Sequence, residues 1–363
     1  MAKFLKILKI LIKARYTIRK IHQKDLLLYD SLTLEIAKDK LSYSLLETRK
    51  ESFNLRVLIK NMLKFKFSFK SYLESSIKEA NPKLVITLND NDPLFYGLKK
   101  KFPKIKFAAI QNGWRHLNDE SFEKKSFSID YLFIFGKNSV SYYKKYINCK
   151  NYIILGSFRN NNHKILNQKK KGDILFISNF RENFLTKFDV EFKVEPDIIK
   201  ILNAFCQFNK IKFYIAGSSL DNYDKEKKYF FSKLPKKNNG IMIKRQKDKS
   251  YKLIDQFNTI MFIDSSLGYE AIGRKKKIIL ISSRKKNKKI YHPFGYPSFL
   301  SKNSSYFFTN FNNKKKILQI IKNVYSMSNL EWNKKYYNKL NKLMVYNFNN
   351  TKLYSKINQI LEQ

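Results

Sequence analysis

The chain has 363 residues, of which 43% are hydrophobic and 15% aromatic, the composition of a folded protein with length for about two domains. The sequence contains no uncharged apolar run of 18 residues or more, which excludes an ordinary membrane-spanning helix. Cys149, Cys206 and four scattered histidines form neither a disulfide framework nor a zinc-ligand spacing. We therefore expect no metal and no cofactor.

The formal net charge of +44 comes from 73 basic and 29 acidic residues, and only 10 of the basic residues are Arg. Arg is the residue that pairs best with phosphates and guanine edges, and no known nucleic-acid-binding module is visible. Abundant Lys together with Asn, Ile, Phe and Tyr is typical of an AT-rich coding sequence. We therefore interpret most of the charge as compositional and do not expect a nucleic-acid partner, whereas an anionic membrane surface stays a candidate partner.

The first segment, residues 1–24, is predicted to form a basic amphipathic helix. Its apolar side chains fall on one side of a helical wheel, most of its lysines fall on the other, and no signal-peptide cleavage site follows. Such a helix can lie in a membrane interface or pack on a domain with its lysines in water. The sequence leaves both alternatives open.

Short apolar runs then alternate with helical stretches. The predicted strands are 25–29, 42–47, 84–88, 105–110, 131–135, 152–155, 173–178, 212–216, 241–244, 259–263 and 277–281. The predicted helices are 57–64, 72–80, 139–146, 196–208, 251–257, 267–272, 314–324, 330–343 and 352–361. Continuous apolar strands separated by helices predict parallel sheets that are covered on both faces.

The arrangement of these elements predicts an α/β protein with two Rossmann-like domains that face a cleft. We place the first domain at 25–160, a polar linker at 161–172, the second domain at 173–328 and a helical C-terminal tail at 329–363. Ligands of open parallel sheets bind at the carboxyl ends of strands. The segments that follow the predicted strands are therefore the places to look for chemistry.

The segment Asp264-Ser265-Ser266-Leu267-Gly268-Tyr269-Glu270-Ala271 follows a strand and opens a helix. A helix N-terminus with free backbone N–H groups and two hydroxyls can bind a phosphate, and Glu270 could accept hydrogen bonds from ribose hydroxyls. The alternative is a capped helix whose small residues only allow close packing on the sheet.

Two further segments follow strands in the first domain. Ile110-Gln111-Asn112-Gly113-Trp114-Arg115-His116 brings amide, guanidinium and imidazole groups to a tight turn, or forms a polar turn around a half-buried Trp. Leu88-Asn89-Asp90-Asn91-Asp92-Pro93 offers Asp90 or Asp92 as a general base, although such residues at a helix start usually cap it.

Weaker signals follow strands of the second domain, where Arg181 could meet a phosphate and Gly217-Ser218 forms a turn of small residues. The motifs GxGxxG, GxxxxGK[ST] and GxSxG are absent from the sequence. Their absence argues against dinucleotide-dependent dehydrogenases, P-loop enzymes and α/β-hydrolases.

The stretch PKLVITLNDNDPLFYGLKKKFPKIKFAAIQNGWRH (82–116) resembles the bacterial surface carbohydrate biosynthesis proteins. The later IDSSLGYEAIGRKKKIIL (263–280) is similar to a segment of these proteins and of related capsule and glycerophosphate transferases of the GT-B type. The order and spacing of the two segments agree over roughly residues 25–325. The departures are Ser where Thr is common and Arg-Lys-Lys-Lys after Gly273.

The resemblance implies a metal-independent GT-B glycosyltransferase with an N-terminal acceptor domain and a C-terminal nucleotide-sugar domain. It places Ser265, Ser266 and Gly268 at the donor phosphates and Glu270 at the donor ribose or base. The complete set of nucleotide-sugar candidates is Ser265, Ser266, Leu267, Gly268, Glu270, Arg181, Gly217 and Ser218. The acceptor-side candidates are Asn91, Gln111, Asn112, Gly113, Trp114 and Arg115, and the candidate catalytic bases are Asp90, Asp92 and His116.

The expected function is transfer of a sugar from a nucleotide-sugar donor to a surface polysaccharide or lipid-linked acceptor. We expect the protein in the cytoplasm, with a peripheral position on the inner face of the inner membrane. The alternatives are a nucleotide-sugar 2-epimerase, a glycerophosphate-type transferase in which His116 or His292 acts, and a basic lipid- or nucleic-acid-binding protein without catalysis.

Overall fold

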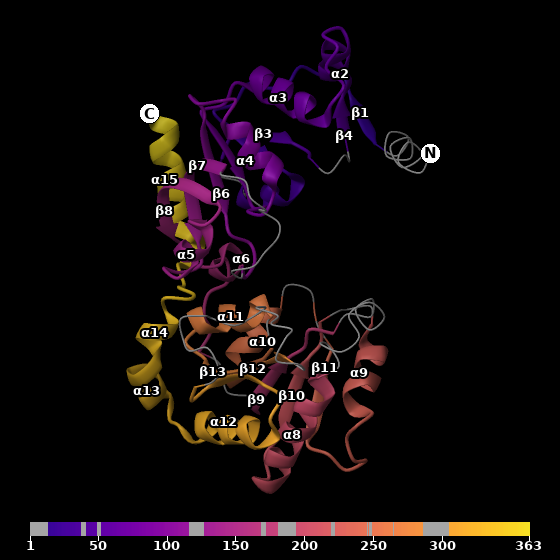
Figure 1. The fold of residues 1–363 in the computed structure, drawn as a ribbon, viewed down its shortest axis with the longest axis vertical. Helices are drawn as coiled ribbons and strands as arrows, with labels where there is room; N and C mark the ends of the chain where they lie inside the picture. The colour runs from indigo at the N-terminus through magenta and orange to yellow at the C-terminus, as the bar shows by residue number, and fades with distance from the viewer. Residues whose placement is uncertain are drawn as a thin grey trace.

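The computed structural model describes residues 14–37, 41–48, 52–115, 127–167, 172–180, 194–218, 222–244, 246, 249–263, 265–285 and 305–363. These residues form two domains, each built on a six-stranded parallel sheet with helices on its faces (Figure 1). The predicted α/β class with two Rossmann-like domains is therefore confirmed.

The first sheet has the strand order β3-β2-β5-β6-β7-β8. Its strands are β2 (Leu26–Tyr29), β3 (Tyr43–Leu46), β5 (Leu84–Thr87), β6 (Lys106–Ile110), β7 (Phe127–Ile134) and β8 (Ile147–Ile154). All residues of β2 and β5 are buried, as the continuous apolar runs indicated. The chain passes from β2 outward to β3 and returns to β5 on the other side of β2, so the topological switch point lies between β2 and β5.

Helices cover both faces of the first sheet. On one face lie α2 (Leu55–Met62), α3 (Phe69–Ala80), α4 (Pro93–Lys99) and α5 (Ser139–Tyr143). On the other lie the 3-10 helix η1 (Ser31–Ile36), α6 (Phe158–Asn161) and α15 (Thr351–Glu362). Helix α15 contributes Leu353, Ile357 and Ile360 to this second core, so the last helix of the chain belongs to the first domain.

The second sheet has the order β11-β10-β9-β12-β13-β14, with its switch point between β9 and β12. Its strands are β9 (Gly172–Ile177), β10 (Phe213–Ala216), β11 (Gly240–Ile243), β12 (Phe257–Phe262), β13 (Lys277–Lys285) and β14 (Phe308–Phe311). Its helices are α8 (Glu195–Phe208), α9 (Tyr223–Phe231), α10 (Ser250–Asp255), α11 (Ser266–Gly273) and α12 (Lys314–Ser326).

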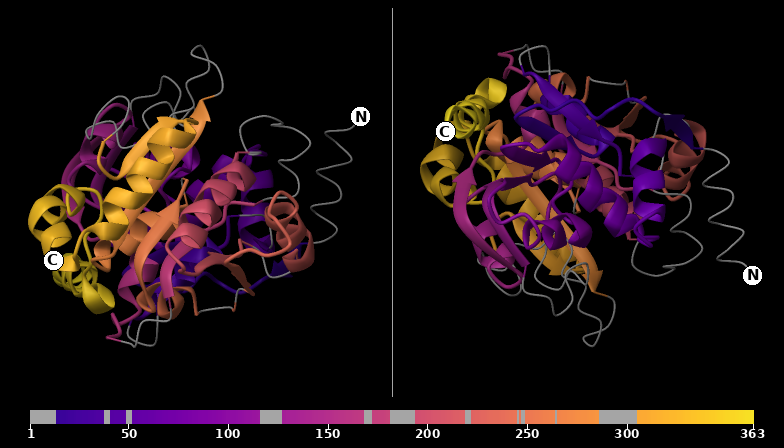
Figure 2. Two further views of the ribbon diagram at one scale, coloured as in Figure 1. Left: turned by 90° about the horizontal axis from the view of Figure 1, so that it is seen from below. Right: turned by 90° about the horizontal axis from the view of Figure 1, so that it is seen from above.

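The C-terminal tail crosses from the second domain to the first (Figure 1), and its yellow helices lie at one side of the molecule in the views from below and above (Figure 2). Helices α13 (Asn329–Trp332) and α14 (Asn338–Leu340), joined by a π-helical turn (Asn333–Tyr337), pack on the second core through Trp332, Tyr336 and Leu340. The segment 329–363 is therefore not one unit, because its second half packs on the first domain.

The crossing segment lies tightly against two glycines. Gly156 has a φ of +84°, and a Cβ there would lie 2.3 Å from the carbonyl oxygen of Val345. A Cβ at Gly136 would lie 2.4 Å from the carbonyl oxygen of Lys342. Only glycine lets the tail pass this close to both positions.

Two sequence expectations require correction. The helix predicted over 1–24 does not extend through its second half, because Arg15–Thr17 form strand β1 and pair with β4 (Ser52–Asn54); residues 1–13 lie outside the described part. The predicted linker 161–172 is not simply solvated. Asn161 is fully buried, and its amide nitrogen donates to the carbonyl oxygen of Leu155 and to Asn350 Oδ1 at 2.9 Å each.

Candidate functional site

The two motif segments, which come from different domains, touch each other. The ring of Trp114, after β6, is stacked on the ring of Tyr269 in α11, with centroids 3.9 Å apart and planes inclined by 2°. The backbone N–H of Trp114 also donates to Ser266 Oγ at 3.3 Å. The structure therefore brings together the turn of the first domain and the start of α11 that the sequence singled out separately.

The start of α11 has backbone donors without a helical acceptor. Ser265 occupies the N-cap position without a side-chain cap, and its carbonyl accepts the N–H groups of Gly268 and Tyr269. Among the described residues, no acceptor is bonded to the N–H groups of Ser266 and Leu267, which lie in the first turn and are half-buried. Because α11 directly follows β12, this positive helix end lies beside the switch point of the second sheet and suits an anion.

Gly268 has a packing role in this helix. A Cβ at position 268 would lie 2.2 Å from Cγ of Phe262, the last residue of β12. The glycine thus lets α11 approach the end of its own strand, which is the alternative that the sequence left open for the small residues of this segment.

Glu270 is buried and occupied within the protein. Its Oε1 accepts a hydrogen bond from Ser157 Oγ at 2.5 Å, and its Oε2 accepts one from the Tyr251 hydroxyl at 3.0 Å. Burial raises the pKa of this carboxyl above its usual value. Glu270, which is 7% exposed, therefore connects α11 to the N-cap of α6 in the first domain and to α10 in the second.

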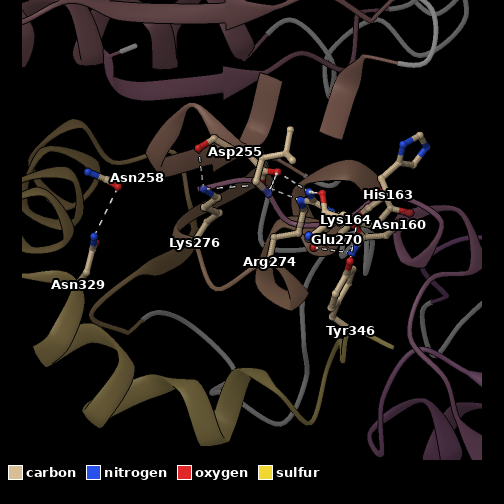
Figure 3. A network of polar contacts seen from close by, with 11 residues as sticks. Asn160, His163, Lys164, Asp255, Asn258, Glu270, Arg274, Lys276, Asn329 and Tyr346 are labelled. Atoms are coloured by element: carbon tan, nitrogen blue, oxygen red, sulfur yellow. Dashed lines mark hydrogen bonds and ion pairs between the residues drawn. The ribbon is translucent and has the colours of Figure 1, made fainter. Parts of the chain in front are cut away.

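One turn further along the chain, Arg274 ties residues 160–164, where the chain leaves the first domain, to the second domain (Figure 3). Its guanidinium forms a two-pronged ion pair with Asp255, at 2.9 and 2.5 Å, and both side chains are buried. The remaining donors of Arg274 reach Asn160 Oδ1 and the carbonyl oxygens of His163 and Lys164, at 2.9 to 3.1 Å. Sequence reasoning missed this network, because its partners lie far apart in the chain.

Asp90 is fully buried at the carboxyl end of β5 and accepts four hydrogen bonds. Two come from Arg115, at 2.8 and 2.6 Å, one from the backbone N–H of Asn112 at 3.0 Å, and one from the Tyr143 hydroxyl at 2.5 Å. Arg115 also donates to Asn112 Oδ1 at 2.9 Å. The carboxylate thereby fixes the conformation of the turn that carries Trp114.

Asp92 has a different environment at the same switch point. It is half-buried at the N-cap of α4, where Oδ1 accepts the N–H of Leu94 at 2.9 Å and Oδ2 accepts the Tyr29 hydroxyl at 3.0 Å. Burial raises the pKa of this carboxyl, and the negative charge of Asp30 at the end of β2 raises it further. Asp92 is thus a carboxylate with more basic character than an ordinary surface Asp.

Tyr29 and Asp30 were missed by the sequence analysis. Asp30 directly follows the predicted strand 25–29. The strand-end rule, by which ligands bind at the carboxyl ends of parallel strands, selected Asp90 and Asp92 and could have selected Asp30 as well. It has a φ of 80°, unusual for a residue other than glycine, and its Oδ1 accepts the N–H of Leu32 at 3.0 Å.

The other predicted residues are partly structural. Gln111 is buried and braces the turn, since its Nε2 donates to the carbonyl of Gly113 at 3.0 Å and its Oε1 accepts the N–H of Phe135 at 2.9 Å. After β10, the backbone N–H of Ser218 donates to the buried carboxylate of Glu226, at 2.9 and 3.1 Å. That carboxylate occupies the turn of Gly217 and Ser218, which the sequence analysis named among the nucleotide-sugar candidates.

The remaining candidates are spread over described and undescribed parts of the chain. Asn91 is half-buried beside Asp92. His116, Arg181, Asp264 and His292 lie outside the described residues. In the part of the chain that the structure describes, no group of three His, Cys, Asp or Glu side chains could hold a metal ion, and no helix is long and apolar enough to span a membrane.

The family model described as "putative O-antigen biosynthesis protein" matches residues 108–361, well over half of the chain. The chain belongs to this family. The match includes the turn at Trp114 and the start of α11, and it confirms the resemblance to proteins of surface carbohydrate biosynthesis. No curated protein matches the sequence.

Solved structures with the same fold include nucleotide-sugar epimerases and a glycosyltransferase. The "putative UDP-N-acetylglucosamine 2-epimerase" of Listeria monocytogenes is 10% identical, with a TM-score of 0.55 over 93% of this chain and 97% of that one. The UDP-GlcNAc 2-epimerase of Methanocaldococcus jannaschii, in complex with UDP-GlcNAc and UDP, is 12% identical, with a TM-score of 0.54 over 92% and 98%. A glycosyltransferase from Rickettsia africae is 14% identical, with a TM-score of 0.52 over 100% and 93%. The protein of this O-antigen biosynthesis family therefore has the GT-B-like fold that its sequence predicts.

Proposed function

We propose that this protein is a glycosyltransferase that moves a sugar from a nucleotide-sugar donor to a surface polysaccharide or to its lipid-linked precursor. One observation supports this most strongly: Trp114 of the first domain is stacked on Tyr269 and bonded to Ser266 at the uncapped start of α11. A donor held at α11 would therefore lie beside the segments that follow the strands of the first domain. Membership of the O-antigen biosynthesis family supplies the substrate class.

In this proposal the second domain holds the donor phosphates. The N–H groups of Ser266 and Leu267 and the hydroxyl of Ser265 supply hydrogen bonds, and the helix end supplies positive potential. When the bond between the sugar and the phosphate breaks, its electron pair leaves with the nucleotide. Donors aimed at that developing charge lower the barrier of the transfer. This chemistry is the metal-independent one that we propose for the protein.

The first domain holds the acceptor. In an inverting transfer the acceptor hydroxyl attacks the anomeric carbon and gives its proton to a base, for which Asp92 is our candidate. Its half-buried carboxylate and raised pKa fit that role, whereas the lone pairs of Asp90 are engaged by Arg115, Asn112 and Tyr143. Asp90 is therefore a positioning residue for the turn of Trp114. His116 stays a second candidate base.

Glu270 has a positioning role in this scheme as well. Its two oxygens accept hydrogen bonds from Ser157 at the N-cap of α6 and from Tyr251 in α10, so it holds α11 against both helices. A contact between Glu270 and the donor ribose would have to share or displace these bonds.

We also propose a cytoplasmic protein that binds the inner face of the inner membrane, where a lipid-linked acceptor would be available. The net charge of +44 favours an anionic lipid surface. Deletion of residues 1–20 followed by vesicle binding at two salt concentrations tests whether the N-terminal segment contributes. Unchanged binding would remove that segment from the proposal.

The donor site is tested by thermal unfolding of the purified protein with UDP, CDP, GDP, CMP and their sugar conjugates. A ligand present at about 100 times its Kd stabilises the folded state by about 2.7 kcal/mol, which raises the Tm measurably. The variant Ser266→Pro removes the first N–H of α11 at a position where Pro is tolerated. Ser266→Ala is its matched control, because both variants lose the hydroxyl but only the first loses the N–H.

We expect one nucleotide class to raise the Tm of the parent protein and of Ser266→Ala, and to have no effect on Ser266→Pro. Incubation with the sugar conjugate then separates the enzyme alternatives. A transferase releases nucleotide only when an acceptor is present, whereas an epimerase changes the sugar without one. If no nucleotide raises the Tm while nucleic acid or lipid binds in a salt-sensitive manner, the transferase proposal is wrong.

A further inference from the structure

The end of α2 and the turn after it expose an unusual concentration of apolar side chains. Residues 59–67, which we term the α2 tip, include five large hydrophobic residues that are more than half exposed. They are Ile59 (55%), Met62 (58%), Leu63 (77%), Phe65 (86%) and Phe67 (73%). Soluble proteins rarely gather so many exposed apolar side chains in one short segment, and such patches mark interaction sites.

The backbone of the tip is fixed in a conformation that presents these side chains. Phe65 has a φ of 54°, in the left-handed region where glycine or asparagine is the usual residue after a helix. The N–H of Phe65 donates to the carbonyl of Met62 at 2.9 Å, and the N–H of Lys66 donates to that of Asn61 at 2.8 Å. The chain therefore holds a bulky aromatic residue in a sterically unfavourable conformation, although its ring has little contact with the rest of the protein.

Along the sequence, the charged residues around the tip are all basic. Residues 52–73 contain five basic residues and no Asp or Glu. Lys60 pairs with Glu79 at 2.9 Å, but Lys64 and Lys66 are exposed and form no ion pair within the described part of the chain. Lys64 and Lys66 alternate with Leu63, Phe65 and Phe67, an arrangement in which apolar groups can enter a bilayer while ammonium groups stay at its headgroups.

The position of the tip suits a membrane contact. Figure 1 shows α2 at the end of the first domain that is farthest from the second domain. A surface there can be covered without obstructing the contact between Trp114 and Ser266. Pairing of two tips from two copies would instead bring Lys64 and Lys66 close to their like-charged counterparts, which disfavours a second copy as the occupant.

We propose that the α2 tip docks on an anionic lipid bilayer, with Leu63, Phe65 and Phe67 inserted at the headgroup boundary and Lys64 and Lys66 bound to lipid phosphates. The proposal rests on the membrane location given under the proposed function, and it is independent of the transfer reaction. It names a surface outside residues 1–20.

The test is co-sedimentation of the full chain with vesicles of phosphatidylcholine alone and of phosphatidylcholine with about one third phosphatidylglycerol. The tip variant is Leu63→Ser/Phe65→Ser. Its matched control is Phe208→Ser/Leu330→Ser, because these side chains are 87% and 77% exposed against 86% and 77% for Phe65 and Leu63. The charge variant Lys64→Glu/Lys66→Glu has the control Lys236→Glu/Lys237→Glu, two other exposed lysines.

We expect the parent chain and both controls to bind the anionic vesicles, and each tip variant to bind them about tenfold more weakly or worse. Phe65→Gly should also weaken binding while raising the Tm, because glycine relieves the left-handed residue. The proposal is overturned if Leu63→Ser/Phe65→Ser binds as tightly as its control. The proposal is also overturned if a tip variant differs from the parent chain in molar mass, measured by light scattering, but not in vesicle binding. The tip would then contact a second copy of the chain. The nucleotide-dependent rise in Tm should persist in every tip variant, so failure of this proposal is distinguishable from failure of the transferase proposal.

Discussion

The indole of Trp114 lies parallel to the ring of Tyr269, 3.9 Å from it, and this stack joins the two domains. Tyr269 is fully buried and meets Phe262 of β12 edge-on, with centroids 5.1 Å apart. The stack thus connects the turn after β6 to the end of β12 through three aromatic rings. Any motion that separates the two motif segments must first break it.

Trp114 should therefore report on ligand binding. The chain has two tryptophans, and Trp332 is buried in the core of the second domain, so the variant Trp332→Phe leaves Trp114 as the sole indole. We expect the nucleotide that raises the Tm to change the emission of Trp114 in this variant, because it binds beside the stack. Trp114→Phe/Trp332→Phe is the blank. If the emission stays unchanged at saturating nucleotide, the nucleotide does not bind beside the stack of Trp114 and Tyr269.

Two glycines should respond to alanine with opposite signs. Gly268→Ala forces Cβ into the ring of Phe262, and we expect it to lower the free energy of unfolding by about 1–3 kcal/mol. Gly97 lies in α4, and a Cβ added there would have no neighbouring atom within 4 Å, so Gly97→Ala should raise stability by about 0.5–1 kcal/mol. Denaturant unfolding of both variants measures the difference. Equal effects would mean that α11 adjusts without cost.

The sheets were predictable because their strands are buried on both faces. The runs 84–88 and 259–263 are continuously apolar, and β5 and β12 lie within one or two residues of these bounds. Strand β14 was missed, because FTNF is short and half polar. The linker was predicted to be solvated because its sequence is rich in polar residues. Residue type alone does not distinguish a buried asparagine that bonds to a backbone carbonyl from an asparagine in solvent.

The site was predictable only in part, and for a physical reason. The strand-end rule selects both the turn of Trp114 and the start of α11, because parallel strands all present their carboxyl ends at one edge. The hydrogen bond between Trp114 and Ser266 spans 152 residues, so no local pattern contains it. Glu270 accepts hydrogen bonds from Ser157 and Tyr251, which lie outside every motif, so these contacts could not be predicted from the sequence.

The fully buried ion pair of Arg274 and Asp255, which joins α11 to α10 within the second domain, should be a sensitive point for stability. Arg274→Met removes the two-pronged ion pair of the buried Asp255, whose carboxylate still accepts the N–H of Leu166 at 2.9 Å and lies 3.9 Å from Lys276. We expect a loss of about 3–5 kcal/mol in the free energy of unfolding. Arg274→Lys keeps the charge but not the two-pronged geometry, so its free energy of unfolding should lie between those of the parent and Arg274→Met. The double variant Arg274→Met/Asp255→Leu should recover part of the loss. Denaturant unfolding followed by circular dichroism measures all three, and a double variant less stable than Arg274→Met would contradict this account.

Glu270 should make stability depend on pH in a defined direction. Burial raises the pKa of its carboxyl in the folded state above the unfolded value near 4.5, so the folded protein binds more protons between these two pKa values. The contribution of Glu270 to stability therefore falls as pH rises through that window and is constant above it. Glu270→Gln removes the titration, and its Tm minus that of the parent should grow from pH 4.5 upward. A difference that stays constant with pH would show that the carboxyl titrates alike in both states.

Asp92 should control the rate of transfer without controlling donor binding. Asp92→Asn keeps the oxygen that accepts the N–H of Leu94 at the N-cap of α4, and its amide nitrogen can donate to the Tyr29 hydroxyl oxygen, so the fold and the nucleotide-dependent rise in Tm should be retained. As the general base is lost, we expect kcat to fall by about 10²–10⁴-fold. Asp90→Asn is the contrasting variant, because it weakens the partner of the buried Arg115 and should lower the Tm as well.

The pH profile then distinguishes a base from a merely structural carboxylate. A base acts when deprotonated, so the acid limb of kcat/KM should lie above the ordinary Asp value of about 3.9, because burial raises the pKa of Asp92. The hydroxyl of Tyr29 stabilises the charged form, and Tyr29→Phe should move this limb to still higher pH while leaving the plateau rate closer to that of the parent than Asp92→Asn does. If Tyr29→Phe lowers the plateau without moving the limb, the group that titrates is not Asp92, and the base must be sought at His116.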